Sequence, residues 1–177
     1  MDEQTDQELV KACLEGSKVA FAQLVVRYQD SVYGLAVGMT RNHADAADMA
    51  QEAFIRAYAK LDQYNPEYGF RSWLLRICAN QAKNLFRKRM NRKGTEDEYR
   101  LQEEVRQDDE GADYHELEAA MARLPPKLGA PLRLKYIEGM AYDEVAAVLG
   151  IGVSAAKMRV LRARNLLAEM LDYEKAR

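Results

Sequence analysis

Apolar residues recur along most of this chain at steps of three and four, which is the spacing of one face of an α-helix. No segment shows the sustained alternation of apolar and polar residues that is typical of a half-buried β-strand. Thr5 is followed three residues later by Glu8, a capping-box pattern that opens the first helix, and Gly16 separates that helix from the next. The hydrophobic pattern therefore predicts an all-α protein.

The first apolar block occupies residues 1–92, and we expect it to fold as one small helical domain. The turn at 42–45 predicts a new helix over about 45–61, and Ser72 is a plausible N-cap for another helix that reaches the cations at 87–89. The stripe expected to be buried on the 45–61 helix consists of Met49, Ala50, Ala53, Phe54, Ala57, Tyr58 and Leu61.

A second apolar block, residues 115–177, predicts a second small helical domain. We expect helices over about 127–137, 142–149 and 153–171. Pro131 removes a backbone donor, so the first of these helices is expected to start late or to bend.

The two blocks are separated by residues 93–114, where apolar residues are sparse and acids abundant, so we expect a flexible linker. Residues 71–93 carry eight Lys or Arg and no acid, whereas residues 96–118 carry eleven acids and two Arg. The net charge of −2 therefore conceals two strongly charged segments, and the acidic one is expected to compete with DNA phosphates for the cations.

Residues 142–164 have the pattern of a helix–turn–helix. Ala146 is small where two helices would cross, and Gly150 accepts the positive φ of a tight turn. A helix that follows such a turn fits the DNA major groove, with its first residues at base edges and later cations at phosphates. An ordinary helical hairpin with a solvated basic face is the alternative. The candidate DNA-contacting residues are Ser154, Ala155, Lys157, Arg159, Arg162 and Arg164.

A second candidate face begins with the aromatic ring of Trp73 and continues with amides and cations at helical spacing. A ring that stacks on an unpaired base, beside cations that hold the backbone, suits a single strand. The alternatives are a half-buried core tryptophan and a solvated basic surface. This face contains Trp73, Arg76, Asn80, Lys83, Asn84 and Arg87.

The outer face of the 45–61 helix is acidic and partly apolar, with Asp48, Gln51, Glu52 and Ile55. Such a patch suits the docking of a basic partner helix, but a plain solvated face has the same composition. The residues alone do not decide between these two interpretations.

Several classes of function have no residues to support them. Cys13 and Cys78 stand far apart and each His is isolated, so we expect reduced thiols and neither a metal nor another cofactor. The sequence contains neither a nucleophile with a neighbouring base nor a glycine-rich phosphate loop, so it does not indicate an enzyme. The acidic N-terminus lacks a signal-peptide pattern, and no apolar run approaches the roughly 18 residues of a membrane span. We expect a cytoplasmic protein without membrane insertion.

At these residues the chain resembles an extracytoplasmic-function sigma factor, a member of the sigma-70 family. The resemblance is carried by DAADMAQEAFIRAYAKLDQY at 45–64, FRSWLLRICANQAKNLFRKR at 70–89 and YIEGMAYDEVAAVLGIGVSAAKMRVLRARNLL at 136–167. It covers most of the chain outside the linker.

The resemblance implies a promoter-specificity subunit for transcription initiation, with core RNA polymerase, promoter DNA and an anti-sigma factor as partners. The 45–61 helix would bind the clamp helices of the polymerase large subunit, which supplies a partner for the acidic patch. The first domain would open the −10 element, the helix at 153–164 would read the −35 element, and the linker would occupy the RNA exit path. A pocket for a flipped base lines up with Arg56, Lys60, Tyr64 and Asn80.

Two departures from the family pattern bear on the −35 element. Ser154 and Ala155 stand where Gly-Thr is usual, and Met158 stands where Ser is frequent, so the −35 sequence is expected to differ from the usual one. Two other classes remain open on the residues alone. One is a free-standing dimeric regulator of the two-component output type, and the other is an enzyme with an inconspicuous carboxylate site.

Overall fold

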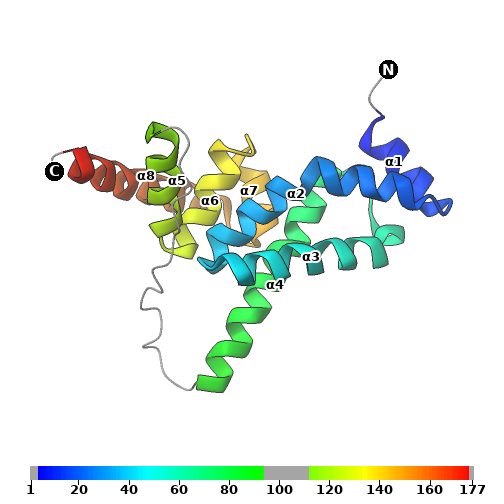
Figure 1. Cartoon of the computed structure of the whole chain (residues 1–177), viewed down its shortest axis with the longest axis horizontal. Helices are drawn as coiled ribbons and strands as arrows, with labels where there is room; N and C mark the ends of the chain where they lie inside the picture. The colour runs from blue at the N-terminus through cyan, green and yellow to red at the C-terminus, as the bar shows by residue number, and fades with distance from the viewer. Residues whose placement is uncertain (1–3, 94–111, 176–177) are drawn as a thin grey trace.

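The computed structural model describes residues 4–93 and 112–175, and within these ranges the regular structure is helical, with no strand (Figure 1). The all-α expectation is confirmed. The elements are α1 Asp6–Leu14, α2 Lys18–Thr40, α3 His43–Ala59, the 3-10 turn η1 Leu61–Gln63, α4 Phe70–Lys93, α5 Ala112–Arg123, α6 Pro126–Tyr136, α7 Tyr142–Leu149 and α8 Val153–Lys175.

Polar side chains cap the first three helices. Thr5 and Glu8 form the expected capping box, in which the Glu8 carboxylate accepts from the Thr5 backbone N–H at 2.7 Å. Ser17 caps α2, and the Asn42 side chain accepts from the Asp45 N–H at 2.9 Å to start α3. Caps of this kind are each worth about 1 kcal/mol to a helix.

Helices α2, α3 and α4 pack together, and α1 lies against the beginning of α2 and against η1 (Figure 1). The apolar stripe expected on α3 is largely confirmed, since Ala53 and Ala57 are fully buried, although Tyr58 is 45% exposed. The fully buried centre of this bundle includes Leu9, Leu24, Val32, Leu35, Leu74 and Leu75.

Helix α4 begins two residues before the expected N-cap. Its first residue is Phe70, and the N–H of Trp73 donates to the carbonyl of Gly69 at 3.2 Å, so Ser72 already lies in the first turn. The ring of Phe70 is 1% exposed. Burial of the Phe70 ring favours a helix that begins at Phe70, whereas an N-cap at Ser72 would place the first residue of the helix after Ser72.

The C-terminal helices form the expected helix–turn–helix. Helix α7 ends at Leu149, Gly150 adopts a left-handed conformation with φ of 59°, and α8 follows. Pro131 lies buried inside α6, which begins at Pro126, so the expected late start is wrong, while the bend expected as its alternative stays a prediction. Helix α6 packs on α8 through a small apolar cluster that contains Leu124, Leu132, Val160 and Ala163.

The two helical halves share one continuous core. Ala130, Leu134, Val145 and Leu149 from the C-terminal half belong to the same buried cluster as the residues of α2 and α4. Figure 1 shows α6 and α7 beside α2 and α4, while the far part of α4 extends away from the other helices. The sequence predicted two domains, but it did not predict this packing of one against the other.

Small residues allow α2 and α6 to approach closely. A Cβ built on Gly38 would lie 3.8 Å from the backbone nitrogen of Ala130, and one built on Gly129 would lie 3.5 Å from the carbonyl oxygen of Gly38. The Arg133 guanidinium covers Gly34. Most of the predicted linker, residues 94–111, lies outside the described residues, and α5 begins within the predicted linker, at Ala112.

Candidate nucleic-acid interface

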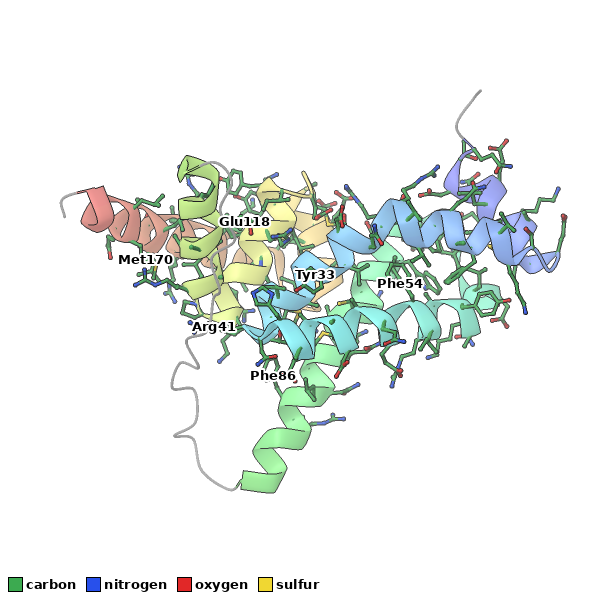
Figure 2. All side chains as sticks on the ribbon, viewed as in Figure 1. Tyr33, Arg41, Phe54, Phe86, Glu118 and Met170 are labelled. Carbon is green, nitrogen blue, oxygen red and sulfur yellow. The ribbon has the colours of Figure 1, made fainter. Side chains whose placement is uncertain are left out.

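The polar face of α4 is exposed as the helical spacing predicted. Arg76, Asn80, Asn84 and Arg87 are all exposed, and the Asn84 side-chain oxygen accepts from the Arg87 guanidinium at 3.2 Å. Figure 2 shows α4 continuing past Phe86 away from the rest of the molecule.

Trp73, at the start of this face, is half-buried in a group of aromatic rings. Its ring centroid lies 5.4 Å from that of Tyr64 and 5.7 Å from that of Phe70. Tyr28 of α2 contacts Phe70 from the other side, at 5.7 Å. We call Tyr28, Tyr64, Phe70 and Trp73 the aromatic cluster. These rings pack against Trp73, and part of its surface remains exposed.

The residues expected at a flipped-base pocket differ in their surroundings. Arg56 forms an ion pair with Glu52 at 2.6 Å, and Lys60 is exposed at the end of α3. Tyr64 is only 9% exposed, and its hydroxyl donates to the Tyr68 carbonyl at 2.7 Å. Burial raises the pKa of the Tyr64 phenol, with a further contribution from the charge of Asp6. Tyr64 therefore belongs to the wall of the aromatic cluster.

The recognition face predicted on α8 is also largely exposed. Ser154, Lys157, Arg162 and Arg164 are exposed, whereas Ala155 and Arg159 are half-buried. Two of the cations lie over aromatic rings, with Lys157 Nζ 5.8 Å from the centroid of Tyr142 and Arg164 Cζ 5.9 Å from that of Tyr136. Tyr136 and Tyr142, which the sequence did not single out, thus lie beside two cations of the predicted recognition face.

The polar face of α4 packs against the end of α7, close to the predicted recognition face of α8. The ammonium of Lys83 donates to the main-chain carbonyl of Leu149, at the end of α7. Partial burial lowers the pKa of Lys83, and the positive charges of Arg76 and Arg159 lower it further. Cations that the sequence assigned to two separate DNA contacts are therefore close neighbours here.

The buried carboxylate of Glu138 forms a second polar contact between the two halves. Glu138 is 8% exposed; its Oε2 accepts from the Ser31 hydroxyl of α2 at 2.7 Å and lies 3.8 Å from the Arg71 guanidinium of α4. No feature of the sequence singles out this residue, because its partners are more than sixty residues away along the chain.

The acidic outer face predicted on α3 is exposed at Asp48, Gln51 and Ile55, and the Ile55 side chain is 55% exposed. Beside it, α2 and α3 border an open groove, and Figure 2 shows Tyr33 and Phe54 between these two helices. The groove is lined by Val25, Gln29, Asp30, Tyr33, Ala47, Ala50, Gln51 and Phe54. Sequence reasoning missed the part that α2 contributes, because the pairing of α2 with α3 is a tertiary contact.

Within residues 4–93 and 112–175, no group of three or more His, Cys, Asp and Glu side chains is placed to hold a metal ion. Over the same part of the chain, no helix is both long enough and apolar enough to cross a membrane.

Two family descriptions match the chain. Sigma-70 region 2 matches residues 24–92, and Sigma-70, region 4, matches residues 114–167. The first match contains the aromatic cluster and the polar face of α4, and the second contains the helix–turn–helix.

Relatives and solved structures agree with these matches. The chain is 33% identical to the RNA polymerase sigma-H factor of Pseudomonas aeruginosa, over 97% of this chain and 96% of the relative. It is 33% identical to the ECF RNA polymerase sigma-E factor of Escherichia coli strain K12, over 94% and 95% of the two chains.

Two solved structures have similar folds. One is CnrH in complex with the cytosolic domain of CnrY, with a TM-score of 0.67, 28% identity, and coverage of 95% of this chain and 97% of that one. The other is the sigma factor RpoE in complex with the anti-sigma factor NepR from Bartonella quintana, with a TM-score of 0.74, 25% identity, and coverage of 86% and 96%.

Proposed function

The chain belongs to the sigma-70 family, in its extracytoplasmic-function group, and we propose that its two exposed cationic faces give core RNA polymerase its promoter specificity. The observation that carries the assignment of residues is the combination on α4 of a half-accessible Trp73 with a polar, cationic face that begins one turn later. A ring for stacking beside cations for the backbone suits an opened strand better than a closed duplex.

Trp73 is assigned to the edge of the opened −10 element, where its free side stacks on an unpaired base. Arg76, Asn80 and Arg87 follow along the strand, and Lys83 and Asn84 complete the face. Arg56 and Lys60 supply cations at the end of α3, and the wall formed by Tyr64 supports Trp73. Phosphate contacts position the strand, and contacts to the base edges select its sequence.

The N-terminal part of α8 is assigned to the major groove of the −35 element. Ser154 and Ala155 lie in the first turn of the helix, where base edges are within reach, and Lys157, Arg159, Arg162 and Arg164 follow as phosphate contacts. The small side chains of Ser154 and Ala155 leave base selection to few polar atoms.

Promoter binding requires the two halves to separate. Elements named −10 and −35 are about 25 base pairs apart, which corresponds to about 85 Å of duplex at 3.4 Å per base pair. In this structure, Lys83 and the end of α7 are joined by a hydrogen bond. We therefore assign residues 1–92 and 115–177 to two domains that move apart when the polymerase and the promoter bind, with residues 93–114 between them.

The acidic outer face of α3 is assigned to the clamp helices of the polymerase large subunit. Asp48 and Glu52 supply negative charge around the exposed apolar side chain of Ile55, and Gln51 joins this face to the groove beside α2. An apolar centre surrounded by charge suits a basic amphipathic helix. Because RpoE was solved with an anti-sigma factor, we also assign to this chain control by such a partner.

The chemistry of RNA synthesis is assigned to the polymerase, and this chain is proposed to have no enzymatic activity or cofactor of its own. We propose that it acts in the cytoplasm, together with the polymerase. Run-off transcription by purified core polymerase, with and without the full-length chain, tests the proposal on a set of candidate promoters. Initiation at defined promoters only when the chain is present supports it. Specific binding of duplex operators by the free chain as a dimer, with no effect on initiation, would indicate a free-standing regulator instead.

A further inference from the structure

We propose that Asp6 of α1, through the hydroxyl of Tyr28, is a positioning residue that keeps the aromatic cluster in the form in which Trp73 meets the opened strand. This inference rests on the proposed function and adds a component to it. Helix α1 lies before the region 2 match, which begins at residue 24. It carries none of the residues assigned above to DNA or to the polymerase.

Asp6 joins α1 to two consecutive residues of α2. Its Oδ1 lies 2.6 Å from Nη1 of Arg27, and its Oδ2 accepts the hydroxyl proton of Tyr28. The same guanidinium donates to the backbone carbonyl of Gln4 at 2.8 Å. Asp6 and Arg27 each have about a quarter of their side chain exposed, at 23% and 24%, so this contact is partly shielded from water. A shielded carboxylate holds both donors more firmly than an exposed one does.

The hydroxyl of Tyr28 fixes a ring that belongs to the aromatic cluster. Tyr28 packs on Phe70 with centroids 5.7 Å apart, and Phe70 in turn packs on Trp73. Burial raises the pKa of the Tyr28 phenol, and its hydrogen bond to Asp6 raises it further, so the hydroxyl stays protonated and remains a donor. Rotation of the Tyr28 ring would remove the support of Phe70, the first residue of α4.

A second contact links α1 to the loop that precedes α4. The side-chain amide of Gln7 donates to the carbonyl of Pro66 at 3.4 Å, and the apolar side chains of Leu9, Val10 and Cys13 are buried beneath α1. The loop includes Tyr68, whose carbonyl accepts from the Tyr64 hydroxyl. Helix α1 thus contacts both supports of Trp73, namely the Phe70 side through Tyr28 and the Tyr64 side through the loop.

The chain contains a single tryptophan, so the fluorescence of Trp73 reports on this site without labelling. The test compares the full-length chain with Tyr28→Phe, which keeps the ring and removes only the hydroxyl, and with Asp6→Ala, which removes its acceptor. Tyr58→Phe is the matched control, because it removes a hydroxyl on α3 from a ring that packs on Phe21, outside the aromatic cluster. Trp73→Ala is measured alongside.

Three quantities are measured: acrylamide quenching of Trp73 in the free chain, affinity for core polymerase, and the rate at which permanganate-reactive thymines appear in the holoenzyme–promoter complex. We expect Tyr28→Phe and Asp6→Ala to slow opening by about tenfold or more, the size of effect that loss of one charge-assisted hydrogen bond produces. Quenching should rise in both variants, core affinity should stay unchanged, and Tyr58→Phe should behave as wild type.

Normal opening by Tyr28→Phe, with impaired opening by Trp73→Ala, would overturn the positioning role and leave the proposed function intact. Slower opening without a change in Trp73 quenching would also overturn it, because the effect would then not pass through the cluster. Normal opening by Trp73→Ala would refute the role assigned to Trp73 itself, and the positioning role with it.

Discussion

The ammonium group of Lys83 on α4 donates a hydrogen bond to the main-chain carbonyl of Leu149, the last residue of α7. A Cβ built on the next residue, Gly150, would lie 3.0 Å from that nitrogen. The turn of the helix–turn–helix therefore rests directly on the face assigned to the −10 strand. Under the proposed function, this contact would have to break before the −10 face and the helix–turn–helix could bind separate promoter elements.

Gly38→Leu is expected to separate the two halves. The Cβ position at Gly38 has room, but the added branches of leucine would meet the backbone of Gly129 and Ala130 on α6. Overpacking of this kind costs about 1–3 kcal/mol. Small-angle scattering of the free chain should give a larger radius of gyration for Gly38→Leu. Gly38→Ala is the control, because it favours the helix to a similar degree and fits the space. Equal radii for the two variants would mean that α2 and α6 do not hold the halves together.

Trp73→Ala should impair promoter opening more than it impairs binding to core polymerase. Losing one base–aromatic stack costs about 1–3 kcal/mol, so the rate of opening should fall by roughly tenfold. Permanganate footprinting of the melted region measures this change, and Trp73→Phe, which retains a ring, should recover part of the rate. If the alanine variant melts the promoter at the wild-type rate, Trp73 does not stack on a base and serves only in the packing of the protein.

Glu52→Arg should weaken association with core polymerase. The substitution removes the ion pair with Arg56 and places a positive charge where a basic partner helix is expected. Reversal of one charge at such a contact should weaken binding by about tenfold or more. The dissociation constant of the full-length chain for core polymerase measures it. Glu169→Arg, a reversal at an exposed position of α8, is the control. Equal affinities for the two variants would show that the α3 face is only solvated.

Neither cysteine should react with iodoacetamide at pH 8 while the chain is folded. Burial raises the pKa of Cys78 to about 12 and also raises that of Cys13, so both remain thiols, which are poor nucleophiles. Both should be alkylated in denaturant, where the pKa returns to its ordinary value near 9. Mass spectrometry of the labelled chain measures the difference.

The raised pKa of Cys78 also makes the free energy of unfolding depend on pH. Between about pH 9 and 12, the folded chain keeps the Cys78 proton that the unfolded chain loses, so the free energy of unfolding should fall as pH rises. Cys78→Ala should reduce this slope. Rapid labelling of Cys78 under native conditions would contradict its burial.

Much of the secondary structure was predictable from local sequence, because its determinants are neighbours along the chain. The capping box of Thr5 and Glu8, the glycine turn at Gly150 and the bounds of α7 involve residues within a few positions of one another. Periodicity at three and four residues likewise predicted most of the exposed side chains of α4 and α8, although Trp73, Ala155 and Arg159 are half-buried. These features need only the helix geometry and the chemistry of short-range hydrogen bonds.

Tertiary structure decided everything that joins segments distant in sequence. Nothing local to Lys83 indicates Leu149 as its partner, and nothing local to Asp6 indicates Tyr28. Helix α4 begins early at Phe70, whose ring is buried among rings from other segments, and Pro131 lies inside α6. Helical spacing determines only which face a side chain occupies. Which faces then meet depends on shape and buried area summed over several helices, and no single stretch of sequence contains that information.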